Sequence, residues 1–302
     1  MADLRPLHQS FFALGRYRYA LLPVLLALGS TIAYMLQPPT HEPNGATWLG
    51  YTLGSIAAAL IIILMGYGIR RRVFGGKVGN ASGWLTIHVY FGLCTLVVAS
   101  LHCGFHFGRN IHTVAYVLMC LVVASGCWGV YAYLRYPALL VRVRGNSSRD
   151  QLLRQIAEFD QQALSLAASL NAILREFVID AIRRTRIGGG LWAQLRARDE
   201  SMLLLSPPLN PGVAMLVSNQ GQRALIDMLS RQYAAAVASR ETRDTLDQLL
   251  KVAGHKAVVQ RRLQLDLQLQ ALMQFWLYLH LPLSFGLLMA LAIHIFAVFF
   301  YR

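Results

Sequence analysis

The apolar segment HVYFGLCTLVVASLH begins at His88 and ends at His102, and a second one, HLPLSFGLLMALAIH, begins at His280 and ends at His294. Each segment therefore carries two histidines that are fourteen residues apart. In an α-helix this spacing corresponds to about 21 Å along the axis and about 40° of rotation between the two side chains. Each helix would present one imidazole near each face of a bilayer, on nearly the same side of the helix.

The composition indicates an integral membrane protein. Of the 302 residues, 56% are apolar and only 14% are charged. A stretch of about 20 apolar residues is long enough to cross a bilayer. Five stretches qualify: residues 19–36, 48–69, 84–105, 113–134 and 275–301. We therefore predict an all-α fold whose membrane part is a bundle of five transmembrane helices.

Basic side chains predict the orientation of these spans. They cluster before the first span, between the second and third, and after the fourth: Arg5, Arg16, Arg18, Arg70, Arg71, Arg72, Lys77, Arg135, Arg142 and Arg144. The opposite side has only Arg109 and Arg302. Because Lys and Arg are enriched in cytoplasmic loops, we expect a cytoplasmic N-terminus and a periplasmic C-terminus, in the inner (cytoplasmic) membrane of a bacterium.

The formal net charge of +14 also fits a membrane protein. Residues 135–272 hold 19 basic and 12 acidic side chains, spread along helices rather than gathered in one patch. Attraction to anionic lipid headgroups accounts for this charge. We therefore expect membrane lipid, and no nucleic acid, as a partner.

About 140 residues separate the fourth span from the fifth, which divides the chain into three parts. Residues 1–134 would form helices 1–4, residues 135–272 a helical domain inserted on the cytoplasmic side, and residues 273–302 the fifth helix. Residues 263–270 alternate Leu with Gln or Asp, but no β-branched residue supports a strand. We predict a helix there that continues into the last span.

The insert contains two amphipathic segments. Apolar residues from Leu152 to Phe177 follow a 4-3 spacing. This spacing predicts one long helix with an apolar seam that packs against another helix. Ser147 or Ser148 would cap its start, and the three glycines 188–190 would end it. A second segment, residues 222–252, would pair with it as an antiparallel hairpin. The Pro-rich stretch 206–212 between them is expected to be a turn or loop.

The histidine pairs predict two metal centres in line across the membrane. The third and fifth spans run parallel, so His88 is level with His280, and His102 with His294. A lone histidine in a span often only bonds to a neighbouring helix, but two equal spacings are hard to explain in that way. Four imidazoles on two helices would clamp two haems, the inner between His88 and His280 and the outer between His102 and His294. No CxxCH motif is present, so attachment would be non-covalent, as in b-type haems.

Residues around the histidines fit this arrangement. Gly92 and Ser284 each lie one helical turn after a histidine and would leave room for a flat macrocycle, although small residues also serve helix packing. Arg109 is a candidate partner for an outer propionate. His106 and His112 are expected to have a surface role: proton exchange, a propionate contact, or a place facing the electron acceptor. The cysteines form no CxxC pair, which makes iron–sulfur ligation improbable.

The paired histidines resemble those of the ferric-reductase-like superfamily, which includes NADPH oxidases and metalloreductases. The resemblance covers the third to fifth spans and implies two b haems and outward electron transfer. The same four-histidine scheme is also similar to cytochrome b of quinol-oxidising complexes. Residues 1–302 show no sixth span and no flavin or nicotinamide domain after the bundle, so we do not expect a self-sufficient NADPH oxidase.

We therefore expect a membrane cytochrome b, an electron-transfer subunit of an oxidoreductase complex. A cytoplasmic redox partner would dock on residues 135–272, and a periplasmic cytochrome or metal centre would exchange electrons with the outer haem. One alternative is a quinone-reactive membrane-anchor subunit of a multisubunit dehydrogenase or reductase. The other, from a different class, is a non-haem membrane scaffold or signalling protein.

Overall fold

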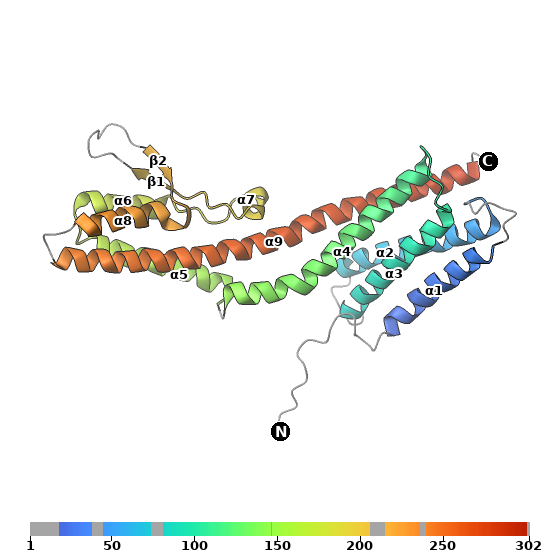
Figure 1. Cartoon of the computed structure of the whole chain (residues 1–302), viewed down its shortest axis with the longest axis horizontal. Coiled ribbons are helices and arrows are strands. Elements are labelled where there is room, and N and C mark those ends of the chain that lie inside the picture. The colour runs from blue at the N-terminus through green and yellow to red at the C-terminus, as the bar shows by residue number, and fades with distance from the viewer. Residues whose placement is uncertain are drawn as a thin grey trace, which may run out of the picture. The chain divides into compact units, whose positions relative to one another are not determined.

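The computed structural model describes residues 18–37, 45–73, 81–145, 147–205, 215–235 and 240–300. The described chain is mostly helical (Figure 1). Its elements are α1 (Arg18–Met35), α2 (Trp48–Val73), α3 (Ala81–Cys103), α4 (Ile111–Arg144), α5 (Arg149–Ala167), α6 (Ala172–Arg183), α7 (Leu191–Leu195), β1 (Met202–Leu205), β2 (Met215–Ser218), the 3₁₀ turn η2 (Gln220–Gln222), α8 (Arg223–Ala235) and α9 (Arg240–Phe300). Arg5, Arg16, Lys77, Arg302 and the expected loop 206–212 lie outside the described residues.

Four of the described helices, α2, α3, α4 and α9, are long and apolar enough to cross a membrane. The first expected span corresponds to α1, which is a shorter apolar helix. The described chain therefore has four helices that could span a membrane by length and composition, while the five-span topology stays a prediction.

The chain divides into two compact units. The first, which we call the apolar unit, comprises Met1–Tyr131 and Trp276–Arg302. Within it α3 packs closely against both α2 and α1, and a buried core contains Leu53, Val98 and Leu287. Large apolar side chains such as Ile63 and Phe296 are more than half exposed on the outside of this unit. Helices that are apolar on all sides are typical of a lipid environment.

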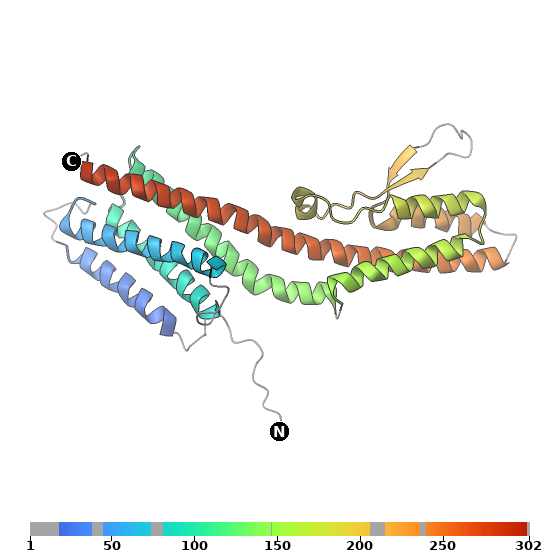
Figure 2. The ribbon, with the colours of Figure 1, turned by 180° about the vertical axis from the view of Figure 1, so that it is seen from behind.

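The second unit, Ala132–Phe275, packs α5, α6, α8 and the first part of α9 around a separate core, which includes Val178, Leu229 and Leu249. A two-stranded antiparallel hairpin joins this core through the buried Leu203 of β1 and lies beside α6 (Figure 2). The all-α prediction is therefore wrong at this hairpin. The two strands pair with each other over four residues, which satisfies their facing backbone groups without a larger sheet.

The long helix predicted from Leu152 to Phe177 is interrupted in the structure. Ser148 does cap its start, and a capping box joins Ser148 to Gln151. However, α5 ends at Ala167, and Asn171 then caps α6 by accepting a hydrogen bond from the Leu174 N–H at 2.9 Å. The apolar seam continues across the break because both helices pack on the same core. The second amphipathic segment is likewise divided between α8 and the start of α9.

α9 is continuous for 61 residues and belongs to both units. It contains the Leu/Gln stretch 263–270 as helix, which confirms that prediction. In the second unit its Asp266 carboxylate is fully buried and accepts hydrogen bonds from Arg144 at 2.5 Å and from Arg149 at 2.8 Å. These two arginines tie the end of α4 and the start of α5 to α9.

Candidate functional site

The four predicted histidines all lie in the apolar unit, two on α3 and two on α9. The ring centroids of His102 and His294 are 6.2 Å apart. His88 and His280 are close enough to interact electrostatically. The structure thus brings each histidine of α3 to the partner on α9 that lies at the same level.

The His102 ring is held in one orientation by α2. Its Nδ1 lies 2.7 Å from the carbonyl oxygen of Gly50. Because a carbonyl oxygen can only accept, Nδ1 must carry the proton, and Nε2 of the neutral ring is left with its lone pair. Metal-ligating histidines are typically fixed in this way by a hydrogen bond from the other ring nitrogen. The geometry therefore suits His102 to ligate a metal through Nε2.

Gly54 makes this close approach to α2 possible. A Cβ atom added at Gly54 would lie 2.7 Å from Cε1 and 2.8 Å from Nδ1 of His102. Those distances are well inside van der Waals contact, so any side chain at this position must push the imidazole away from the Gly50 carbonyl.

Gly54→Ala is therefore expected to weaken the binding of a metal or haem by His102 and His294 at least about tenfold, the lower limit for the loss of a contact that orients a ligand. The measurement is a titration of the apo chain with haem and with a transition-metal ion, each counted separately per chain. Gly66→Ala is the matched control, because Gly66 lies on the same helix and an added Cβ meets nothing within 4 Å. Equal affinity in the two variants would contradict the prediction.

His280 is oriented by a similar hydrogen bond, to a residue of α4. Its Nδ1 lies 2.7 Å from Oγ of Ser125, whose hydroxyl donates to the Val122 carbonyl oxygen at 2.7 Å. Since the only hydroxyl hydrogen is used there, the Nδ1–H of His280 donates to Ser125, and Nε2 again keeps its lone pair. His280 is thus also presented as a ligand through Nε2.

Trp276 completes the surroundings of His280. Its indole lies beside the His280 ring, with centroids 5.5 Å apart, and its Nε1–H donates to the Ser125 carbonyl oxygen at 2.7 Å. A Cβ atom added at Gly129 would overlap this indole, so glycine is needed at this position. Sequence reasoning missed Ser125 and Trp276, because only the packing of α4 on α9 brings them to His280.

The other predicted site residues are placed as follows. A Cβ at Gly92 would meet nothing within 4 Å, so there is open space beside α3 at this turn. Ser284 is buried, and its hydroxyl donates to the His280 carbonyl oxygen at 2.7 Å. Arg109 is exposed in the connection between α3 and α4, as is His106.

His112 has a different environment from the one expected. It is half-buried at the start of α4, with its ring centroid 5.3 Å from that of His102 and 5.0 Å from that of His294. Nitrogen atoms of these three rings all lie within 4.8 Å of one another. The short connection from Cys103 to Ile111 places His112 near the end of α3, but it does not determine whether the His112 ring faces His102 and His294.

The two histidine pairs fit a haem differently. At the inner pair, His280 presents Nε2, and its ring lies beside Gly126 of α4, where an added Cβ would be 3.7 Å from Cε1. His88 and His280 would therefore suit a haem held between them. At the outer pair, two imidazoles ligating one metal from opposite sides at about 2 Å would have centroids roughly 6 Å apart, close to the observed 6.2 Å. However, His112 is nearly equidistant from the two rings and nearer to each than they are to one another. It lies beside their midpoint, where the macrocycle would pass, so an outer haem requires His112 to move.

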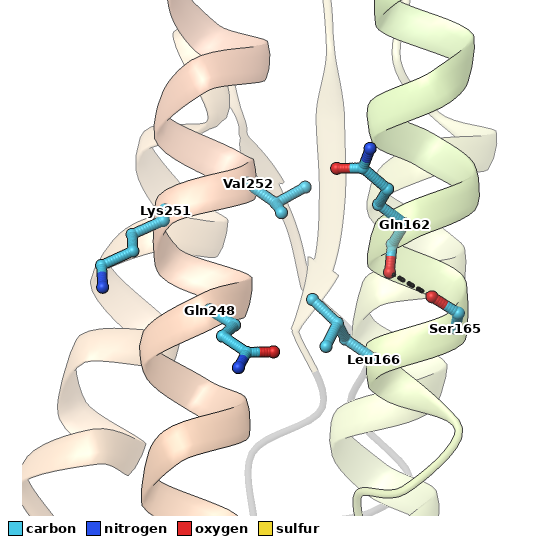
Figure 3. Close-up of a pocket in the computed structure, with 6 residues that line it drawn as sticks. All are labelled: Gln162, Ser165, Leu166, Gln248, Lys251 and Val252. Carbon is cyan, nitrogen blue, oxygen red and sulfur yellow. Dashed lines mark hydrogen bonds between the residues drawn. The ribbon is translucent and has the colours of Figure 1, made fainter.

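A shallow groove of about 370 Å³ lies elsewhere, in the second unit, between α5 and α9 (Figure 3). Its lining residues are Gln162, Ser165, Leu166, Gln248, Lys251 and Val252. The one cation among them, Lys251, pairs with Asp247 at 2.7 Å. The groove contains no histidine, cysteine or carboxylate. Among the described residues, the histidine cluster that could hold a metal ion lies in the apolar unit.

In comparisons with known proteins, no family model, no curated protein and no solved structure matches this chain.

Proposed function

We propose that this chain is a membrane cytochrome b subunit that passes electrons across a bilayer. His88 and His280 would hold a b haem at the inner level, and His102 and His294 would hold the second redox centre, for which the sequence predicts a second haem. The observation that carries the proposal is the hydrogen bond from His280 Nδ1 to Ser125, which leaves Nε2 as a ligand atom. Metal-ligating histidines are commonly oriented by a hydrogen bond of this kind from the other ring nitrogen.

A haem held by His88 and His280 would supply outer-sphere electron transfer, because two histidine ligands would leave no position on its iron for a substrate. The role of the chain is to fix the two rings, exclude water and tune the imidazole basicity. Ser125 sets the tautomer of His280, and the Trp276 indole lies beside its ring, with centroids 5.5 Å apart. Hydrogen bonds of this kind tune the metal through its ligand.

The proposal includes a topology and partners. α1 would be the first of five spans, with the N-terminus in the cytoplasm and the C-terminus in the periplasm of a bacterial inner membrane. The second unit would dock a cytoplasmic redox partner, or the inner haem would exchange electrons with quinol. A periplasmic cytochrome or metal centre would exchange electrons on the other side.

The test is a dithionite-reduced minus oxidised spectrum of the purified chain in detergent, with haem counted per chain by pyridine haemochrome. The expected result is a low-spin b-type spectrum with at least one haem per chain. Folded protein without haem would contradict the proposal and favour a non-haem scaffold.

A further inference from the structure

We propose that His102, His112 and His294 form a site for a single first-row transition-metal cation at the outer end of the apolar unit, in place of a second haem. The site uses residues from three helices, α3, α4 and α9. It goes beyond the inner haem of the proposed function and does not depend on it.

The three side chains converge as ligands of one ion would. Their nitrogen atoms lie within 4.8 Å of one another, and all three rings are half-buried. Three nitrogens bound to one ion at 2.0–2.1 Å lie about 3.3 Å apart in tetrahedral geometry. Small changes in the side-chain torsion angles would bring the three nitrogen atoms to the separation that one bound ion requires. The hydrogen bond to the Gly50 carbonyl oxygen already orients the His102 ring, and the Nε2 lone pair is left to bind the ion.

The position of His112 favours a bare ion over a macrocycle. A haem between His102 and His294 would need the space beside their midpoint, and the His112 ring occupies it. An ion is small enough to sit among all three imidazoles. His112 therefore obstructs a haem between His102 and His294, and it would itself be a ligand of a bare metal ion.

The donor set also indicates the class of metal. Three neutral imidazoles suit Cu, Zn, Ni or Fe, whereas Mg²⁺ and Ca²⁺ prefer carboxylate and carbonyl oxygens. The described cluster includes no carboxylate. For a given nitrogen site, affinity among divalent first-row ions is highest for Cu²⁺, so Cu²⁺ is the best probe. Three protein ligands leave a further coordination position open.

The experiment uses the full chain purified with a histidine-free affinity tag, stripped with EDTA and titrated with Cu²⁺. Electron paramagnetic resonance reports nitrogen coordination, and haem is counted in the same samples. The wild type is expected to bind one Cu²⁺ per chain in a nitrogen-rich site. His112→Gln should weaken binding at least about tenfold and leave haem content unchanged. His106→Gln is the matched control, because His106 is exposed and outside the cluster; it should bind as the wild type does.

The outcomes separate this inference from the proposed function. Two haems per chain with no His112-dependent Cu²⁺ binding would overturn the inference and support the two-haem form of the proposed function. His112-dependent Cu²⁺ binding by a chain without haem would support the inference and contradict the proposed function. Equal Cu²⁺ affinity of His112→Gln and the wild type would overturn the inference whatever the haem count.

Discussion

His280→Gln is expected to prevent binding of the proposed inner haem, so that the haem content falls by about one per chain. A glutamine amide is a poor ligand for haem iron, and His88 alone would hold a haem more weakly than two histidines. The Ser125 hydroxyl would also lose the ring that it orients. The reduced-minus-oxidised spectrum and the pyridine haemochrome assay measure the loss directly.

His255→Gln is the matched control for this variant. His255 lies on the same helix but in the second unit, where its ring is 6.1 Å from that of Phe159. Its haem content should equal that of the wild type. His280→Gly with added imidazole distinguishes ligation from folding, because free imidazole can restore the ligand but not a lost fold. Full haem content in His280→Gln would show that His280 is not a ligand.

The helices of the apolar unit could be predicted because a membrane span leaves a long, uniform signal. Residues 48–69 and 84–105 were expected as spans, and α2 and α3 cover most of them. The helical reading of residues 263–270 also succeeded, since Leu and Gln favour helix and no breaker precedes the last span. These features depend on local composition alone.

The details of the site could not be predicted, because they depend on contacts between distant segments. Ser125 lies 155 residues from His280, and nothing in the spacing of either segment pairs them. The inward position of His112 depends on how tightly α4 returns beside α3. In the second unit, Asn171 interrupts a regular apolar seam by capping a new helix, and periodicity alone cannot report such a break.

Asp266→Asn is expected to lower the free energy of unfolding of the second unit by about 3 kcal/mol, which is the scale for breaking a buried ion pair. The Asp266 side chain is fully buried and bonds to both Arg144 and Arg149. An asparagine keeps the shape but leaves two guanidinium groups without a counter-charge. Because these arginines are about one-third exposed, water will compensate part of the loss, and the effect should fall at the lower end of that scale.

Thermal unfolding of the detergent-solubilised chain, followed by circular dichroism, should show the Asp266→Asn transition roughly 5–10 °C below that of the wild type. Asp247→Asn is the control, because its pair with Lys251 lies on the exposed face of α9 and such pairs contribute little.

Asp266 lies three residues after the buried Leu263, on the same face of α9. An acidic residue on an apolar helix face requires a cation when buried, which is why the two arginines meet there. Since the four paired histidines belong to the apolar unit, the haem content should not change in either variant. Equal melting temperatures of Asp266→Asn and Asp247→Asn would show that this ion pair does not hold the second unit together.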